Sequence, residues 1–478
     1  MVETIKIKKG FDLPIGGCAE RRLTDAGHIA TYAVKPTDFV GLQPRLQVAE
    51  GDSVEAGGVL FVDKNDERIR FTSPVAGTVK AIVRGEKRKL LAVVVEHTPP
   101  ARWATSPNPV SGLTFKGEEL ADAKEAMLRS GLWSLLRQRP FGTIPSPDSK
   151  PKAIVISCCD TAPLAPDCDF LLQGREDDFV KGLEALATLT DGPMHVCFRP
   201  DSKLKIRNEE LGIRNCSIHE VVGPHPAGNV GTLIARLCPI NKGEQVWTMN
   251  PQDIATLGHL MRTGQYRPER VVAVAGPAAR NPHYYRTLAG ACVESLVKEQ
   301  VMNDDYPVLA DENVCKTRII SGNVLSGETI APDGFLGAYD SLLTLLPEGD
   351  YYDFMGWLMP GLKKYSFSQT FLSGLIAPLE RLVKLVGIEP TYNFDTNVHG
   401  SVRPLVFTGN FERVFPFDIY PLQLLKACII GDIDLMEKLG IYEVEPEDFA
   451  LCEFIDTSKT DIQPIIREAL EKLRKEAL

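Results

Sequence analysis

Short runs in which apolar and polar residues alternate dominate the first hundred positions of the chain. Glycine, proline and charged residues separate these runs, which is typical of β-strands joined by tight turns. The valines between the glycines fit strands that bury one face. Six strands are predicted in this region: Tyr32–Lys35, Leu46–Val48, Val59–Asp63, Ile69–Phe71, Thr78–Val83 and Leu90–Glu96.

The pattern changes after residue 118, where helical and strand-like segments alternate. Apolar residues between Glu118 and Gln138 fall on one helical face, which predicts a helix there. Alternating strands and helices predict a parallel, doubly wound sheet. The segments that follow are a strand at Ala153–Cys158, a helix at Asp177–Thr190, strands at Met194–Phe198 and Ile218–Val222, and a helix that contains Leu233–Leu237.

Mixed segments follow, and the chain then becomes mostly helical. Asn250–Thr263 predicts a helix, Val271–Ala275 a strand, Ala289–Lys298 a helix and Arg318–Leu325 a hairpin. From Tyr351 onward the spacing of apolar residues favours helices. These helices are expected at Phe367–Val386, Tyr420–Ile430, Leu435–Leu439 and Ile462–Leu473.

Composition narrows the class of protein. The 478 residues are 44% hydrophobic and 24% charged, as in a soluble globular protein of several domains. No apolar run approaches the roughly 20 residues that span a bilayer, and the N-terminus has no apolar segment typical of a signal peptide. A net charge of −10 argues against a nucleic-acid partner. The eleven scattered cysteines form no C-x-x-C pair, so we expect reduced thiols and no cysteine metal site.

The loop between Val222 and Leu233 is the first candidate site. A β-prone run enters it, five glycine and proline residues shape it, and a helix follows. This order points backbone N–H groups and a helix N-terminus at an anion. The loop has neither the G-x-G-x-x-G spacing nor the lysine of a P-loop. An ordinary tight β–α connection therefore stays open as the alternative.

Polar residues at the predicted strand ends extend this candidate site. Ligands of doubly wound sheets lie beyond the carboxyl ends of the strands. Asp160 and Thr161 follow the strand Ala153–Cys158, and His225 and Asn229 lie in the loop. We expect these four side chains to share one crevice. The neighbouring Cys158 and Cys159 are expected to be small core residues, because adjacent cysteines pair only with strain.

Two stretches of the N-terminal region resemble the halves of the biotinyl/lipoyl-carrier fold, a flattened β-barrel. They are VAEGDSVEAGGVL at Val48–Leu60 and SPVAGTVKAIVRG at Ser73–Gly85. In lipoyl domains a hairpin lysine carries the cofactor, and Lys64 stands near that place. Lys64 is thus either a swinging arm or a solvated lysine on a docking module. Further along, Gly276–Tyr285 resembles β-grasp modules of the soluble-ligand-binding (SLBB) type.

The whole chain resembles the NqrA family, which supplies one subunit of the sodium-translocating NADH:quinone oxidoreductases. The resemblance implies an α/β multidomain protein with four parts. They are a lipoyl-like β barrel-sandwich hybrid at 1–105, a Rossmann-like doubly wound domain at 106–258, a β-grasp SLBB-like domain at 259–350 and a helical domain at 351–478. The segments that carry it are Lys6–Ile15, Ser130–Phe141, Gly223–Thr232, Arg318–Gly327, Asn397–Gly400, Gly409–Pro421 and Ala450–Phe454.

This resemblance implies a peripheral subunit on the cytoplasmic face of the bacterial inner membrane. The complex, a translocase, oxidises NADH, reduces ubiquinone and exports Na+. The partners implied are the other Nqr subunits, including integral membrane ones, and these carry NADH, FMN, FAD, riboflavin and the iron centres. No catalytic residue is expected in this chain, so the isolated chain is not expected to catalyse the reaction.

The same order of domains resembles RnfC, the electron-transfer subunit of the Rnf complex, and the flavin-bearing subunit of complex I. Where the flavin subunit has a G-G-A-G-F-P loop, this chain has bulkier residues at Arg139–Thr143. Asn229–Thr232 stands in place of a paired-glutamate loop, and Cys452 alone remains of a cluster-binding cysteine run. One thiolate cannot hold a four-cysteine cluster, so we expect no flavin, cluster or metal here.

Two roles for this chain within the complex stay open. One is a quinone pocket, in which His225 and Asn229 donate hydrogen bonds and Trp133 and Phe141 form an aromatic wall. The other is a non-catalytic scaffold that docks against membrane subunits. An active flavoprotein dehydrogenase and a lipoyl- or biotin-type carrier are the remaining alternatives.

Overall fold

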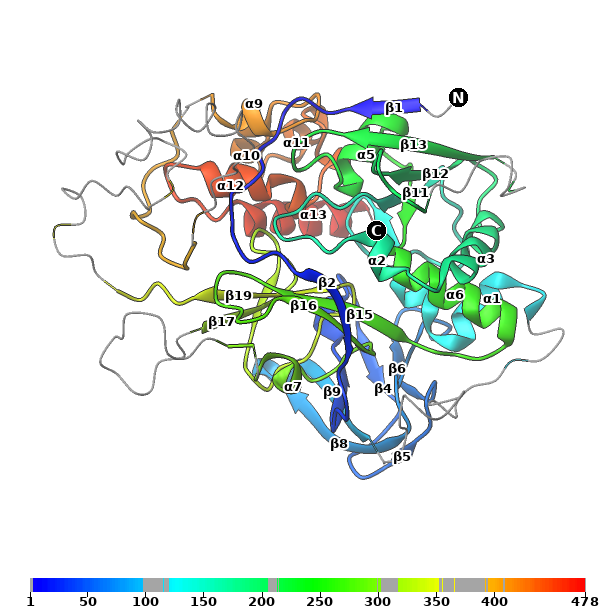
Figure 1. Ribbon diagram of the computed structural model, residues 1–478. Helices are drawn as coiled ribbons and strands as arrows, with labels where there is room; N and C mark the ends of the chain where they lie inside the picture. The colour runs from blue at the N-terminus through cyan, green and yellow to red at the C-terminus, as the bar shows by residue number, and fades with distance from the viewer. Residues whose placement is uncertain are drawn as a thin grey trace.

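A computed structural model describes residues 3–97, 115, 120–204, 213, 215–298, 300–301, 317–351, 355, 365, 392, 394–406 and 409–477. The N-terminal β-sheets lie at the bottom of Figure 1, and the C-terminal helices lie at the top. A six-stranded sheet with its helices lies beside the C-terminal helices at the upper right, and a second six-stranded sheet lies in the middle, above the N-terminal sheets. In the described part of the chain, no helix is long and apolar enough to cross a membrane.

Two small antiparallel sheets form the N-terminal part. Five of their strands overlap the predicted ones closely, whereas the strand predicted at Leu46–Val48 lies at Pro44–Leu46 and the short strand Ser53–Val54 was not predicted. Phe61 and Phe71 lie opposite each other on neighbouring strands of one sheet and stack with ring centroids 4.6 Å apart, and both rings are buried. One sheet has the order β3-β9-β8-β5 and the other β4-β6-β7. The strands are β3 (Thr31–Val34), β4 (Pro44–Leu46), β5 (Ser53–Val54), β6 (Val59–Asp63), β7 (Arg70–Thr72), β8 (Gly77–Arg84) and β9 (Leu90–His97).

A six-stranded sheet with the order β1-β13-β12-β11-β14-β10 forms the centre of the α/β part. All pairs are parallel except β10 with β14, in agreement with the predicted parallel sheet. The strands are β1 (Glu3–Lys6), β10 (Arg137–Arg139), β11 (Ala153–Cys158), β12 (Met194–Phe198), β13 (Cys216–Val222) and β14 (Val246–Thr248).

Helices cover both faces of this sheet because both faces of its strands are apolar. On β11, Val155 packs with α5 (Val230–Leu237), whereas Ile154 and Ile156 face the core shared with α3 (Glu176–Ala187) and α6 (Pro251–Thr263). Asn250 caps α6, since its side chain accepts a hydrogen bond from Gln252 N at 3.0 Å. A short helix, α2 (Cys168–Leu171), lies between β11 and α3.

The predicted helix between Glu118 and Gln138 is wrong in its length. The helix α1 covers only Ala123–Ser130 and ends at Gly131, whose φ of 85° is left-handed. A 3-10 turn at Leu132–Leu135 and the strand β10 follow. The apolar residues past Gly131 are buried as expected, but in a different backbone conformation.

A second six-stranded sheet has the order β18-β17-β19-β15-β16-β2. A hairpin of β17 and β18 is present, but only β17 overlaps the predicted range Arg318–Leu325, and β18 begins after it. The strand at His283–Leu288 lies in a segment for which no strand was expected. The helix expected at Ala289–Lys298 covers only Glu294–Val297, as α7. The strands are β2 (Glu20–Asp25), β15 (Glu269–Ala275), β16 (His283–Leu288), β17 (Thr317–Ser321), β18 (Glu328–Ile330) and β19 (Leu342–Pro347).

Helices of the C-terminal part pack around a separate core that includes Phe415, Phe449 and Leu470. Three of the four predicted helices are present here, and the fourth, Phe367–Val386, lies outside the described residues. The helices are α9 (Phe411–Val414), α10 (Pro421–Ile430), α11 (Ile433–Lys438), α12 (Ala450–Ile455) and α13 (Ile462–Ala477).

Residues 3–25 connect these parts rather than joining the N-terminal sheets. β1 pairs with β13 at the edge of the α/β sheet, and β2 pairs with β16 of the second sheet. Figure 1 shows this segment in dark blue, passing from the top of the molecule to its middle. The order of the chain therefore differs from the order of the sheets it forms.

Two glycines allow α3 and α6 to pack closely. A Cβ added at Gly258 would overlap Asp178 O, and one added at Gly182 would overlap Ile254 O. At the same crossing, Asp178 accepts hydrogen bonds from Arg262 Nε at 2.8 Å and from His259 Nδ1 at 3.1 Å. Backbone contact and paired charges thus fix this helix pair.

We expect Gly258→Ala to destabilise the protein by about 2 kcal/mol, although alanine normally favours a helix, because the new methyl group forces α3 away. Gly400→Ala is the control, since a Cβ added to this exposed glycine would make only ordinary van der Waals contacts, the nearest with the side chain of Lys459 at 3.4 Å. Its effect should stay within about 0.5 kcal/mol. Denaturant unfolding measures both, and equal stabilities of the two variants would contradict the close-packing argument.

Candidate functional site

The loop between β13 and α5 is held in place by the N-terminal segment. Phe11 N donates to His225 O at 2.7 Å, and His225 N donates to Asp12 Oδ1 at 2.7 Å. Gly10 is required at this approach, because a Cβ there would overlap His225 O. Both the N–H and the carbonyl group of His225 are therefore hydrogen-bonded to the N-terminal segment.

Thr161 joins the carboxyl ends of β11 and β13. Its Oγ1 lies 3.3 Å from His225 Nδ1 and accepts a hydrogen bond from Gly228 N at 2.9 Å. The sequence prediction that these strand ends meet is therefore correct for Thr161 and His225. Gly228 permits the approach, since a Cβ there would overlap Cys159 O.

Asp160 and Asn229 flank this contact. Asp160 is exposed, and its carboxylate accepts a hydrogen bond from Ala162 N at 2.8 Å. Asn229 precedes α5 with an extended backbone, but its side chain makes no capping hydrogen bond. These four residues thus bring an imidazole, a hydroxyl, an amide and a carboxylate to the ends of β11 and β13, and His225 is the buried one among them.

Burial controls the protonation of His225. The side chain is buried, and desolvation lowers its pKa to about 4, whereas the charge of Glu447 acts in the opposite direction. The imidazole is therefore neutral near pH 7. It can take part in hydrogen bonding, but it does not offer a positive charge to an anion.

Trp133 and Phe141 lie in different surroundings from His225. Trp133 is fully buried, donates from Nε1 to Pro145 O at 2.9 Å and packs edge-on against Trp247 with ring centroids 5.6 Å apart. Phe141 packs edge-on against Tyr442 of the C-terminal part, with centroids 6.2 Å apart. The ring contacts of these two residues do not include the loop.

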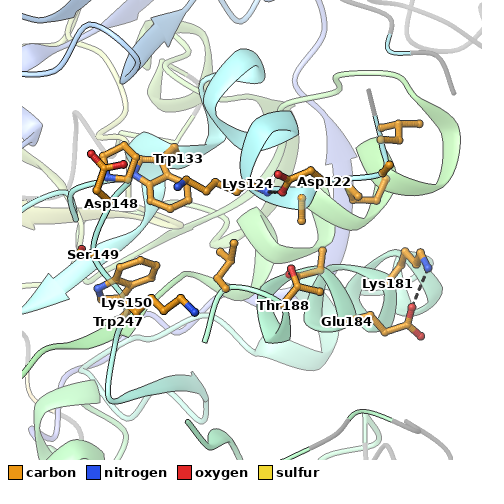
Figure 2. Close-up of a pocket in the computed structure, with 17 residues that line it drawn as sticks. Asp122, Lys124, Trp133, Asp148, Ser149, Lys150, Lys181, Glu184, Thr188 and Trp247 are labelled. Carbon is orange, nitrogen blue, oxygen red and sulfur yellow. Dashed lines mark hydrogen bonds and ion pairs between the residues drawn. The ribbon is translucent and has the colours of Figure 1, made fainter. Parts of the chain in front are cut away.

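A large open cavity lies beside the tryptophan pair and has a volume of about 640 Å³. Figure 2 shows Trp133 with Trp247 at one end and the ion pair of Lys181 with Glu184 at the other. Lys124 and further polar residues point along its walls. Sequence reasoning found only Trp133 of this lining, and the short strand β14 that carries Trp247 gave no chemical signal.

A buried group of charges, also missed by the sequence analysis, borders the first turn of α5. Arg139 donates from Nη1 to Asp448 Oδ2 at 2.7 Å and also pairs with Glu447. Arg139 and Asp448 are 309 positions apart, so no local pattern points to their contact. Burial and the charge of Glu447 raise the pKa of Asp448, and Arg139 lowers it.

Lys64, the candidate cofactor-carrying lysine, is exposed, and the adjacent cysteines Cys158 and Cys159 are buried. Lys64 is exposed at the end of β6, in the hairpin that leads to β7. Cys158 and Cys159 are buried free thiols, as expected for core residues, and burial raises the pKa of both. High pKa values disfavour the thiolate that ligates metals or attacks disulfides.

Comparison with known proteins assigns family domains to most of the chain. Family models match as the NqrA N-terminal barrel-sandwich hybrid domain over residues 5–98, the NqrA second alpha/beta domain over residues 119–266 and the NQRA C-terminal domain, of SLBB type, over residues 271–331.

Full-length relatives agree with these matches. The NqrA subunit of the Na(+)-translocating NADH-quinone reductase from Rhodopirellula baltica is 37% identical over 475 residues, which cover 98% of each chain. The NqrA subunit of Histophilus somni is 36% identical and covers 99% of this chain and 100% of its own. That of Neisseria meningitidis serogroup B has the same identity and coverage. An NAD+-reducing [NiFe]-hydrogenase structure aligns with a TM-score of only 0.37 and 11% identity over 75% of this chain and 67% of its own, which supports no argument.

The buried imidazole predicts a pH effect on stability. The folded pKa of His225, about 4, lies below the ordinary value of 6.5, so this contribution is complete above pH 6.5 and is lost as the pH falls toward 4. Between pH 7 and pH 5, wild type should lose about 2 kcal/mol more unfolding free energy than His225→Gln. Denaturant titrations at both pH values measure the difference. The control His28→Gln changes an exposed histidine and should lose as much unfolding free energy between the two pH values as wild type does. Equal losses in wild type and in His225→Gln would refute the low pKa assigned to His225.

Proposed function

The chain belongs to the NqrA family and is a subunit of the Na(+)-translocating NADH-quinone reductase, and we propose that its own role is docking rather than catalysis. In this proposal it sits on the cytoplasmic face of the membrane against integral Nqr subunits. Those partners hold FMN, FAD, riboflavin and the iron centres, reduce ubiquinone with electrons from NADH and export Na+.

One observation carries this proposal: the loop Arg139–Thr143 is used for packing within the chain. The ring of Phe141 lies against Tyr442, and the carbonyl of Phe141 accepts a hydrogen bond from Arg467 Nη1 at 2.8 Å. In the resembling flavin-bearing proteins, the matching glycine-rich loop approaches a phosphate. A loop that already holds the C-terminal helices is not free to approach a flavin.

The surroundings of Cys452 support the same proposal. This thiol lies in α12 and is fully buried, and burial raises its pKa well above the ordinary value. An iron–sulfur cluster needs several thiolates. Within the described ranges, no group of three or more histidine, cysteine, aspartate and glutamate side chains is placed to hold a metal ion.

We also propose that the family domains extend to the boundaries expected from the sequence, at residues 105, 258 and 350, with a helical domain after the last one. The α/β part is then a Rossmann-like scaffold without its own nucleotide. In this proposal Lys64 is a solvated lysine and not a cofactor arm, so the intact mass of the chain carries no lipoyl or biotinyl addition.

The docking proposal predicts that the isolated chain retains no flavin. After incubation with FMN and gel filtration, the protein peak should show no flavin absorbance, and added NADH should cause no bleaching. Adding the purified chain to membranes that lack it should restore NADH:quinone reductase activity. Stoichiometric flavin that NADH reduces would contradict the proposal and favour a flavoprotein dehydrogenase.

A quinone site is the second candidate, and the cavity in Figure 2 favours it. The cavity is large enough for a quinone ring, and Trp133 and Trp247 supply an aromatic wall. The ammonium group of Lys124 can donate to a ring carbonyl. Quinone pockets combine apolar walls with a few donors in this way.

Titration with a short-tailed ubiquinone tests this second candidate. Saturable quenching of tryptophan fluorescence is expected, and Lys124→Met should weaken binding about tenfold, because a hydrogen bond from a charged donor is lost. Lys80→Met, on an exposed lysine of β8, is the matched control. Weakening by His225→Ala or Asn229→Ala instead would favour the loop crevice, and no binding up to the solubility limit would leave docking alone.

A further inference from the structure

The first turn of α5 meets a carboxylate from the C-terminal part of the same chain. A Cβ added at Gly231 would overlap both carboxylate oxygens of Asp448. The side chain of Asp448 is fully buried. The N-terminus of a helix carries unpaired N–H groups and a partial positive charge, so it favours an anion. The carboxylate therefore lies against the first turn of α5, where its Oδ1 has no hydrogen-bond partner among the described residues.

The neighbouring loop receives a second carboxylate in the same way. A Cβ added at Gly142 would crowd both carboxylate oxygens of Glu445, whose side chain is 1% exposed. Gly142 has a φ of 65°, a left-handed conformation that also favours glycine. The two glycines thus make room for the two ends of one short acidic segment, Glu445–Asp448.

Several buried polar atoms of the acidic segment and of α5 have no hydrogen-bond partner among the described residues. They are Asp448 Oδ1, Glu445 Oε1 and the hydroxyl of Thr232, which lies beside Gly231 in α5. The other oxygens are paired: Asp448 Oδ2 with Arg139 and with Glu445 N at 2.9 Å, and Glu445 Oε2 with Arg467 at 3.0 Å. The acidic segment thus leaves two of its own acceptor oxygens, and the hydroxyl of Thr232, without a hydrogen-bond partner in the described part of the chain.

Charge is balanced only while the acidic segment is in place. Three guanidinium groups and three carboxylates pair with one another here: those of Arg137, Arg139 and Arg467 and those of Glu445, Glu447 and Asp448. Removing one member of a buried pair leaves the other charge uncompensated, which is strongly unfavourable. Without the carboxylate of Asp448, Arg139 and the first turn of α5 would together attract another anion.

We propose that the segment Glu445–Asp448 is an internal ligand, which fills an oxyanion site formed by Arg139, Gly231 and the first turn of α5. The site takes phosphate or a similar oxyanion once Asp448 is shortened. In the native chain the carboxylate closes the crevice and fastens the C-terminal helices to the α/β sheet. This proposal is independent of the docking role, because it concerns only contacts within the chain.

The test is rescue of Asp448→Ala in the full-length chain by inorganic phosphate. In chloride buffer this variant should melt well below wild type. Phosphate at the same ionic strength should raise its melting temperature saturably, by roughly 2–3 °C at 50 times the dissociation constant. Wild type and Asp448→Asn, which keep the crevice filled, should not respond.

Asp122→Ala is the matched control, since Asp122 caps the exposed start of α1 and accepts from Lys124 N at 2.9 Å. It should lose stability without any phosphate rescue. Equal effects of phosphate and chloride on Asp448→Ala, or equal phosphate stabilisation of wild type, would overturn the proposal. If Asp448→Ala does not fold in chloride, the yield of folded chain on refolding in phosphate answers the same question.

Gly231→Ala gives an independent measurement. Alanine normally stabilises a helix relative to glycine, but here the methyl group would overlap Asp448, so the variant should be less stable than wild type. Adding Asp448→Ala to it should cost less stability than the same change costs in wild type. A stabilising Gly231→Ala, or additive effects of the two changes, would show that the carboxylate does not occupy the first turn of α5.

Discussion

A buried charge is tolerated only when a partner of opposite charge lies next to it. The contact between Arg139 and Asp448 places this constraint on the packing of the C-terminal helices against the α/β sheet. Arg139 ends the edge strand β10, and Asp448 belongs to the turn before α12. Neither residue can reach solvent without moving its partner. The C-terminal helices are therefore held to the α/β sheet by a geometric requirement, whatever the net stability of the pair itself.

The N-terminal segment imposes a second constraint on the same region. β1 lies beside β13, and the residues that follow bond both backbone groups of His225. The loop that leads into α5 is thus fixed from one side by the start of the chain and from the other by its C-terminal part. Such contacts between distant segments hold a loop rich in glycine and proline in position.

Local patterns predicted the strands and helices well where one element follows one periodicity. Val59–Asp63 and Met194–Phe198 were predicted with their observed bounds, since their apolar runs end at clear turns. Glu118–Gln138 failed because the apolar spacing continues through Gly131, where the backbone becomes left-handed. The strand His283–Leu288 was missed although its partner β15 directly precedes it in the chain. Its other partner, β2, is remote in sequence, so no local pattern points to that pairing.

The candidate site divides along the same line. Thr161 and His225 could be paired from sequence, because parallel strands place their carboxyl ends at one edge. The Arg139–Asp448 contact could not, because it depends on how the C-terminal helices pack on the α/β sheet. The tryptophan pair could not either, because Trp133 and Trp247 lie far apart in the sequence of the α/β part. This division also bears on function. In phosphate-binding loops, glycine lets an acidic group come close to the backbone. Gly142 and Gly231 have the same role here, because a Cβ at either position would meet a carboxylate. In this chain the acidic groups that make this approach are carboxylates of its own. A fold that resembles redox proteins can therefore keep the shape of a ligand crevice while using it to hold its own domains together, and a chain whose proposed role is docking needs that rigidity more than it needs a cofactor.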